Sequence, residues 1–262
     1  MRRARLIAAA LFVSAACSRR PDVPILTYHS ISAAPDAFTV SEQRFADELD
    51  ALRSRGFQTV TFHEWLAHLE QKTPLPSAPI ILTFDDGYED AYTTVLPALR
   101  ARRMRAVFFI VTSFVGADES HRTVRDEDGI RRRYLVWPEI RGLAAAGMEI
   151  GSHSVSHRRF ADLTGDEVQS ELKRSKQGLE DALGRGIEVF SYPYNSVRRW
   201  MEPLVRDAGY RAAAAGTVHG SADRFALYRM GVFRSTTTEA LLSQLPHPAP
   251  AAPSEAPRAQ SR

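Results

Sequence analysis

The chain has 262 residues, 44% of them hydrophobic and 25% charged, which is the composition of a folded globular protein with a sizeable core. Its formal net charge is +3, but residues 1–16 hold three arginines and no acidic residue, so the chain from Cys17 onward has a formal net charge of zero. This balance gives no argument for nucleic-acid binding, and the single cysteine excludes an internal disulfide.

The chain begins with the layout of an export signal. Three arginines precede an apolar run from Leu6 to Val13, and small residues follow. The run is too short for a membrane-spanning helix, which needs roughly 20 apolar residues. We therefore expect residues 1–17 to be a leader for export, rather than a buried N-terminal helix.

The sequence "SAAC", which ends at Cys17, resembles a bacterial lipoprotein cleavage box, in which the cysteine becomes the lipidated first residue. Ser14 stands where such boxes usually carry a large aliphatic residue, so ordinary cleavage near Ala16 is the alternative. We expect an exported protein of the cell envelope or periplasm, held to the membrane by a lipid on Cys17.

Strand-like and helix-like segments then alternate through residues 22–245. Strands are expected at residues 23–29, 57–62, 79–84, 106–111, 148–151, 188–193, 210–215 and 228–233. Helices are expected at residues 41–56, 64–70, 90–102, 137–147, 164–184, 199–208 and in a last short segment to about residue 245. Ser41 and Gly56 suit the two ends of the first helix, and Thr164 with Glu167 has the spacing of a capping box.

Two segments interrupt this alternation. Residues 117–133 are charged and predict an exposed insertion, in which the arginines at 131–133 form a solvated loop that can alternatively touch an anionic glycan. Residues 246–262 are rich in Pro and Ala and predict a disordered tail. One folded domain over residues 22–245 remains.

Alternating strands and helices predict parallel strands joined by helical crossovers, an α/β fold. Strands buried on both faces explain why the expected strands are continuous apolar runs. A closed barrel and a doubly wound sheet both fit this pattern. We favour the barrel because polar residues gather where strands end, and the reacting residues of barrels lie at the carboxyl ends of their strands.

The adjacent aspartates Asp85 and Asp86 follow one expected strand, where two like charges are costly unless a cation holds them. His153 and His157 follow another strand and are four residues apart, so one helical turn would bring both imidazoles to the same side. Two imidazoles and one carboxylate can bind a divalent metal and leave a position open. Each motif alone is weak, since Asp-Asp-Gly is a common turn and histidines in loops are commonly solvated.

The motifs together resemble a known family. "ILTFDDGY" (81–88), "GSHSVSH" (151–157) and "FSYPYN" (190–195) resemble the first three motifs of the polysaccharide deacetylases with a NodB-like domain, carbohydrate esterase family four. "PILTYHSI" (24–31) resembles the subgroup that includes bacterial poly-N-acetylglucosamine deacetylases. The resemblance covers about residues 24–235 and implies a distorted (β/α) barrel with about seven parallel strands.

The resemblance also implies residue roles. Asp86, His153 and His157 match the metal ligands, and Asp85 matches the general base that takes a proton from the attacking water. Tyr194 matches the tyrosine whose backbone N–H helps hold the oxyanion. Zn²⁺ suits these ligands best, with Co²⁺, Ni²⁺ or Fe²⁺ as alternatives.

The chain departs from the family pattern at the general acid. Most members take this histidine from a motif near the C-terminus, but here neither His219 nor His247 follows a convincing strand. The subgroup takes it from the first strand, where His29 matches. The alternative is a structural histidine beside the strand end.

A second departure lies in the third motif, where Ser191 replaces the arginine that usually orients the base. Arg229, from a late strand, is the candidate replacement, against the alternative of a surface arginine. Tyr194, Pro193 and Arg229 are the residues expected at the substrate. The fourth motif, with its aspartate and tryptophan, is not evident. Aromatic residues that can stack on a sugar, with packing as the alternative, are Tyr134, Trp137 and Trp200.

The leading hypothesis is therefore an exported metal-dependent hydrolase that removes N-acetyl groups from an N-acetylhexosamine glycan of the peptidoglycan or poly-N-acetylglucosamine type. An O-acetyl esterase on another polysaccharide is a close variant. A non-catalytic glycan-binding or scaffold protein on the same barrel is the second hypothesis, and the retained Asp85 argues against it. An iron oxygenase is the third, and the aspartate preceding both histidines argues against it. The sequence does not specify the glycan, the metal or the oligomeric state.

Overall fold

The computed structural model describes residues 23–121, 123–125, 131–216 and 224–247. The predicted leader with Cys17, His219 and most of the predicted tail lie outside these ranges. The strands are β1 (Ile25–Tyr28), β2 (Ser30–Ile31), β3 (Thr39–Val40), β4 (Gln58–Thr59), β5 (Pro79–Phe84), β6 (Val107–Ile110), β7 (Thr123–Arg125), β8 (Arg131–Arg133), β9 (Glu149–Ser152), β10 (Val189–Ser191), β11 (Ala212–Ala215), β12 (Leu227–Tyr228) and β13 (Met230–Gly231). The α-helices are α1 (Glu42–Ser54), α2 (Phe62–Gln71), α3 (Leu96–Ala101), α4 (Trp137–Ala145), α5 (Gly165–Leu183), α6 (Met201–Asp207) and α7 (Thr238–Gln244).

Nine of the described strands form one sheet in the order β12-β11-β10-β9-β6-β5-β1-β13, with β4 attached to β5, and every pairing in it is parallel. Only Arg229 separates β12 from β13. Because β12 pairs with β11 while β13 pairs with β1, this segment joins the two ends of the sheet and nearly closes it. If the β12–β13 segment is counted as one strand and β4 is left out, the barrel has seven strands. The predicted distorted (β/α) barrel of about seven parallel strands is confirmed.

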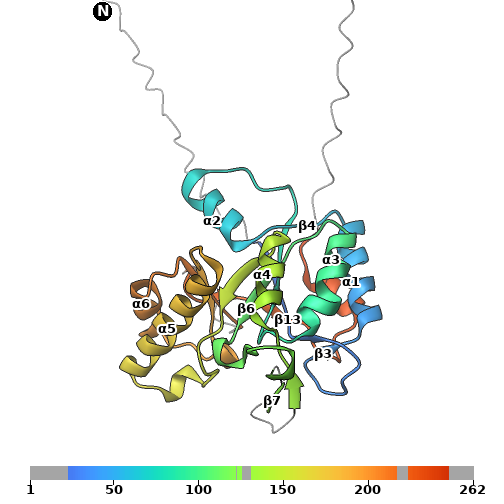
Figure 1. Cartoon of the computed structure of the whole chain (residues 1–262). Coiled ribbons are helices and arrows are strands. Elements are labelled where there is room, and N and C mark those ends of the chain that lie inside the picture. The colour runs from blue at the N-terminus through green and yellow to red at the C-terminus, as the bar shows by residue number, and fades with distance from the viewer. Residues whose placement is uncertain (1–22, 122, 126–130, 217–223, 248–262) are drawn as a thin grey trace, which may run out of the picture.

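Alternate residues of the strands pack into two separate apolar clusters, as strand geometry requires. Leu26 and Leu82 belong to the cluster under the surrounding helices, whereas Ile25 and Ile81 belong to the cluster inside the barrel. Side chains of α2 complete the inner cluster at the amino ends of the strands. Figure 1 shows α2 at one end of the molecule and the strands β3 and β7 at the other. The carboxyl ends of the strands are therefore left for polar residues.

Local capping explains where several helices begin. Ser41 accepts a hydrogen bond from the backbone of α1, and Thr164 and Glu167 form the predicted capping box of α5. The helix predicted over residues 90–102 is instead a π-helical turn followed by α3. Pro97 in this stretch has no N–H, so the regular hydrogen-bond ladder is interrupted there.

The predicted exposed insertion is more structured than expected. β7 and β8 form an antiparallel pair, and the chain after β8 joins the turn that follows β5, since Leu135 N donates to the carbonyl of Gly87 at 2.9 Å. The prediction of a solvated loop is wrong for Arg132, whose side chain is 12% exposed and lies 3.3 Å from Asp36. The insertion therefore packs beside the residues that follow β5.

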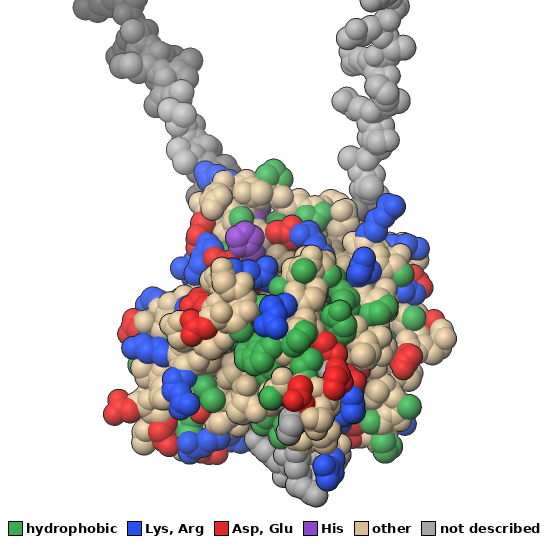
Figure 2. Space-filling model, in the orientation of Figure 1, with side chains coloured by type: hydrophobic (Ala, Val, Ile, Leu, Met, Phe, Trp, Pro, Cys, Tyr) green, Lys and Arg blue, Asp and Glu red, His purple; other side chains and the backbone are tan. Residues whose placement is uncertain are grey.

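On the face shown in Figure 2, acidic and basic side chains are interspersed around a central group of hydrophobic side chains. No helix in the described part of the chain combines the length and the apolar character needed to cross a membrane.

Candidate active site

The inward-facing positions of the barrel change from apolar to polar toward the carboxyl ends of the strands. On β5, Ile81 of the inner cluster is followed at two-residue intervals by Thr83 and Asp85. On β1, the same spacing brings Thr27 and then His29 to the inner face, and the hydroxyls of Thr27 and Thr83 lie 3.1 Å apart. The strand period alone therefore brings these functional side chains to one end of the barrel.

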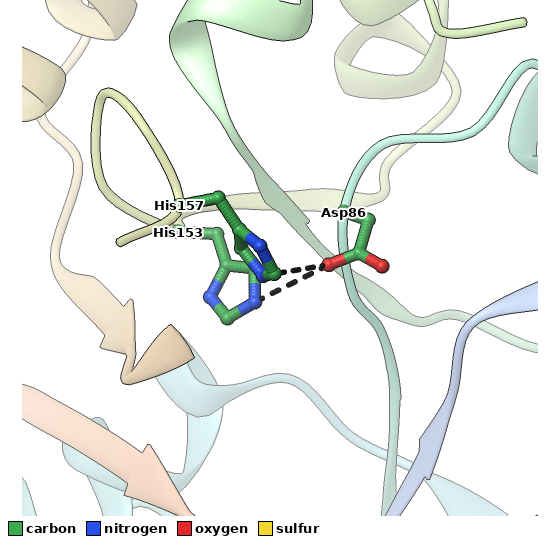
Figure 3. Close-up of side chains that lie close together, drawn as sticks. All are labelled: Asp86, His153 and His157. Atoms are coloured by element: carbon green, nitrogen blue, oxygen red, sulfur yellow. Dashed lines mark ion pairs between the residues drawn. The ribbon is translucent and has the colours of Figure 1, made fainter. Parts of the chain in front are cut away.

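Asp86, His153 and His157 meet at this end. The Nε2 atoms of His153 and His157 lie 3.4 and 3.3 Å from the same oxygen, Oδ1 of Asp86. Figure 3 shows both imidazoles turned toward that oxygen. One ligand atom from each of the three residues lies within 4.8 Å of the others, and no other group of this kind occurs within the described ranges.

The orientation of His153 fits a metal ligand. Its Nδ1 lies 2.7 Å from the backbone carbonyl of Ser191, which only accepts, so Nδ1 carries a hydrogen and Nε2 is the nitrogen left to face Asp86 and a metal. The side chain of His153 is 2% exposed and has little freedom to turn. Two imidazole nitrogens and one carboxylate oxygen are also the donor set that Zn²⁺ and related divalent metals prefer.

A strained loop carries His157. Ser154 and His157 have φ angles of 71° and 59°, and Asp86 across the site has 73°, conformations that side-chain-bearing residues rarely adopt. Glu171 of α5 holds the loop, because its Oε2 accepts hydrogen bonds from the backbone N–H groups of Val155 and Ser156 at 2.8 and 2.9 Å. Non-glycine residues with positive φ gather at this site because the surrounding structure imposes them.

Arg229 lies beside Asp85 and is buried, so the alternative of a surface arginine is wrong. Its Nη1 donates to Oδ1 of Asp85 at 2.8 Å and its Nη2 to Oδ2 at 2.7 Å, the two-pronged geometry of strong arginine–carboxylate pairs. The hydroxyl of Ser191, the residue that stands in place of the usual arginine, lies 3.4 Å from Oδ2 of Asp85. The closing segment of the barrel thus brings a guanidinium to Asp85 from the opposite end of the sequence.

These contacts keep both aspartates ionised. Burial alone would raise the pKa of Asp86, but hydrogen bonds from His153 and His157 hold it well below its usual range. Burial would likewise raise the pKa of Asp85, but the positive charge of Arg229, the proximity of His153 and the hydrogen bonds from Arg229 together lower it. One carboxylate is thus available for a metal and the other for a proton.

Tyr194 follows β10 in a short turn, Pro193–Asn195, whose last two residues have φ angles of 56° and 52°. The Tyr194 ring lies 4.7 Å from the His157 ring, and Oδ1 of Asn195 accepts a hydrogen bond from Arg229 at 3.3 Å. Gly216 leaves the space for Asn195, because a Cβ at Gly216 would lie 2.5 Å from the Asn195 amide nitrogen. Pro193 is buried and fixes the backbone at the start of the turn.

His29 is at the wall of the same cavity. Its Nδ1 is buried and has no hydrogen-bond partner among the described residues. Burial lowers the pKa of His29 despite the opposing charges of Asp86 and Asp85. An unpartnered buried nitrogen is costly in a structure and is typical of a group that meets a ligand.

The side chains surround a cavity of about 570 Å³. Its lining includes His29, Asp85, Asp86, His153, His157, Tyr194 and Arg229, so all the predicted site residues within the described ranges meet there except Pro193, which lies one residue before Tyr194. Of the candidate stacking residues, Tyr134 is at the cavity wall, Trp137 packs against the main core, and Trp200 is exposed and does not line the cavity. His247 is exposed and also absent from the lining.

Two positioning residues are not apparent from the sequence. Glu171 lies on the polar side of an ordinary amphipathic helix and carries no local signal, and nothing in the sequence shows that Asn195 contacts Arg229. Asn195 directly follows the "YPY" motif, which is the one pointer to it in the sequence.

The family model for polysaccharide deacetylases matches residues 72–213. YxkH of Bacillus subtilis, whose name places it among polysaccharide deacetylases, is 29% identical over 217 residues, which are 80% of this chain and 71% of that protein. The poly-β-1,6-N-acetyl-D-glucosamine N-deacetylase of Escherichia coli is 29% identical over 134 residues, 49% of this chain, and the chain spans only 20% of its length. The enzyme of that name from Staphylococcus aureus is 21% identical, with 66% of this chain and 60% of that protein covered.

Solved structures share the fold. The deacetylase PplD of Streptococcus pyogenes, determined with acetate, superposes with a TM-score of 0.74 at 20% identity, covering 86% of this chain and 98% of that one. IcaB of Ammonifex degensii superposes with a TM-score of 0.72 at 24% identity, covering 85% and 96% of the two chains.

Proposed function

Because the chain belongs to the polysaccharide deacetylase family, we propose that it is an exported, metal-dependent hydrolase that removes N-acetyl groups from an N-acetylhexosamine glycan. The observation that carries the proposal is the pairing of the Asp86–His153–His157 group with a second, ionised carboxylate, Asp85. The two relatives named as poly-β-1,6-N-acetyl-D-glucosamine N-deacetylases support a β-linked N-acetylglucosamine polymer as the substrate class. Lipidation at Cys17 remains a prediction from the leader sequence.

Asp86, His153 and His157 would hold the metal, most simply Zn²⁺. When bound, such an ion acts as a Lewis acid that polarises a carbonyl and makes water a nucleophile near neutral pH. His153 is already turned for this role by its hydrogen bond to Ser191. Glu171 would keep the loop of His157 in place.

Asp85 would act as the general base. It is ionised, because Arg229 lowers its pKa. Its Oδ2 lies 3.8 Å from Nε2 of His153, so it stands beside the group formed by Asp86, His153 and His157. There it can orient the attacking water and accept its proton. The arginine would fix the direction of the carboxylate by engaging both oxygens.

The remaining steps concern the tetrahedral intermediate and the leaving amine. The backbone N–H of Tyr194 would donate to the oxyanion, and the loss of one such donor typically costs about 100- to 1000-fold in rate. His29 would give a proton to the amine nitrogen as its bond to the acetyl carbon breaks, so that acetate and a free amino sugar leave. Its unpartnered Nδ1 supports this assignment.

The test is acetate release from N-acetylglucosamine oligomers by the full chain, measured before and after removal of bound metal. We expect release that disappears with a chelator and returns with Zn²⁺. A chain that binds one divalent ion and releases acetate only from O-acetylated glycans would contradict N-deacetylation and establish the esterase alternative. A chain that binds oligomers but releases no acetate from either class would establish a glycan-binding protein.

A further inference from the structure

Two exposed phenylalanines form one wall of the active-site cavity. Phe38, just before β3, and Phe233, just after β13, are 47% and 38% exposed, and both line the cavity. Their rings lie edge to face with centroids 5.8 Å apart, and the Phe38 ring lies 5.1 Å from that of His29. We call Phe38 and Phe233 the phenylalanine wall.

Hydrogen bonds tie together the two loops that carry the wall. The backbone N–H of Arg234 donates to the carbonyl of Ala37 at 2.8 Å, and its guanidinium donates to the carbonyl of Ala34 at 2.8 Å. Within the first loop, Asp36 accepts a hydrogen bond from the N–H of Phe38 at 3.0 Å. The two rings are thus held in a fixed relation, although the loops are almost 200 residues apart in sequence.

A buried polar group supports the wall from below. Arg44 of α1 donates to the carbonyl of Phe233 at 2.7 Å, and its Nε lies 3.2 Å from Glu48. Glu48 has no exposed side-chain surface, and it accepts a hydrogen bond at 2.9 Å from the hydroxyl of Tyr28. Tyr28 is the residue before His29. Burying a carboxylate is costly, so this support is not explained by stability alone.

We propose that the phenylalanine wall stacks on the sugar ring that carries the acetamido group, so that the enzyme selects glycans over small acetyl compounds. The inference rests on the proposed function, because it uses His29 as the proton donor. The amine nitrogen must lie at His29 when the amide bond breaks, and that nitrogen is bonded directly to the sugar ring. The ring therefore lies against the wall next to His29, which is Phe38 and Phe233.

The chemistry of the wall suits a sugar. Hexosamine rings have an apolar face of C–H groups, and rigid aromatic rings bind such faces at little entropic cost. Exposing an apolar phenylalanine ring to water is unfavourable, so two such rings held rigidly beside a polar site are typical of a binding surface. Both rings line the cavity, so the wall supplies an aromatic surface beside the reacting groups.

The experiment compares two substrates on the Zn²⁺-loaded full chain: a pentamer of N-acetylglucosamine and vinyl acetate, a small acetyl ester that has no ring of any kind. The readout is the ratio of their kcat/KM values. Phe38→Ala and Phe233→Ala each lower this ratio about tenfold, mainly through KM for the pentamer, as expected for loss of about half a side chain of apolar contact. Phe38→Trp keeps the ratio within about threefold, because it retains an aromatic face.

Two further variants sharpen the test. Gly231→Ala keeps both phenylalanines but would put a Cβ 2.5 Å from the Phe233 ring, so it displaces the ring and lowers the ratio in the same direction. Trp200→Ala removes an aromatic side chain of similar exposure, 44%, that does not line the cavity, and leaves the ratio unchanged. An unchanged ratio in Phe38→Ala and Phe233→Ala, or an equal fall for both substrates, overturns the proposal.

Failure of the proposed function is distinguishable from failure of the wall. If the wild-type chain releases no acetate from the pentamer, the Kd of the pentamer decides: about tenfold weaker binding by Phe38→Ala supports the wall, and equal binding overturns it. A wall that instead contacts lipid is an overturning outcome. In that case Phe38→Ala loses binding to phosphatidylglycerol vesicles and keeps the substrate ratio.

Discussion

Replacing Arg229 by alanine removes the cation that holds Asp85. Asp85 and Arg229 have side chains that are 4% and 2% exposed, so the variant leaves a buried carboxylate without its cation and its two charge-assisted hydrogen bonds. The positive charge of Arg229 is the main influence that lowers the pKa of Asp85 against the effect of burial. The variant therefore has a higher Asp85 pKa, and turnover falls on the acidic side of the pH profile.

The size of the effect follows from the burial of the pair. Breaking a buried ion pair by removing one partner costs about 3–5 kcal/mol, and one pKa unit corresponds to about 1.4 kcal/mol. If most of that cost falls on the charged carboxylate, the acidic limb moves up by about 2 pH units. In the wild-type chain the Asp85 pKa is lowered on folding, so its stabilisation is present at neutral pH and is lost as the pH falls through that value. The variant should therefore be destabilised most at neutral pH and least in acid.

The assay is kcat/KM for acetate release from about pH 4 to 9, with thermal unfolding of the same samples. Arg229→Lys should recover part of the activity, because a lysine restores the charge but not the two-pronged contact. Arg158→Ala, at an exposed arginine paired with Glu167, is the control and should leave the profile unchanged. An acidic limb and a turnover that are the same in Arg229→Ala and the wild-type chain would refute the role of this pair.

Three further predictions concern other parts of the molecule. Glu171→Ala should weaken Zn²⁺ binding about 10- to 100-fold in a metal titration, because it frees the loop of His157; unchanged affinity would exclude this supporting role. His29→Ala should lower turnover and flatten the basic limb of the pH profile, whereas a retained limb would assign the acid to another group. Burial raises the pKa of Glu149 to about 7, so the free energy of unfolding should fall by up to about 1.4 kcal/mol per pH unit as the pH rises from about 5 to 7. Glu149→Gln should remove this pH dependence in thermal melts. A pH dependence that persists in the variant would contradict the assignment to Glu149.

Much of the barrel could be predicted from the sequence, because parallel strands buried on both faces are continuous apolar runs. The strand at residues 79–84 has the bounds that its apolar run predicts, and α1 and α5 begin at the expected capping residues. The meeting of Asp86 and His153 was predictable in part, since both follow parallel strands whose carboxyl ends share one rim, but Asp86 comes after the inward-facing Asp85 and has a φ angle of 73° that no strand period predicts.

What was not predictable depends on contacts between remote segments. β2, β3, β12 and β13 have two residues each, too few to show a strand period, so neither the division of the last expected strand into β12 and β13 nor the phenylalanine wall is visible in the sequence. In the sequence Arg132 belongs to a charged segment, and only the structure shows that it lies beside Asp36, nearly 100 residues earlier. Long-range pairing of this kind leaves no local pattern.

The most direct test of the central claim is the zinc content of three purified variants, measured together with acetate release. The claim is that Asp86, His153 and His157 jointly hold one divalent ion while Asp85 moves the proton. We predict that Asp86→Ala and His153→Ala lose both zinc and activity, and that Asp85→Asn keeps a full equivalent of zinc and loses activity. Full zinc content in Asp86→Ala, or loss of zinc in Asp85→Asn, would contradict the account.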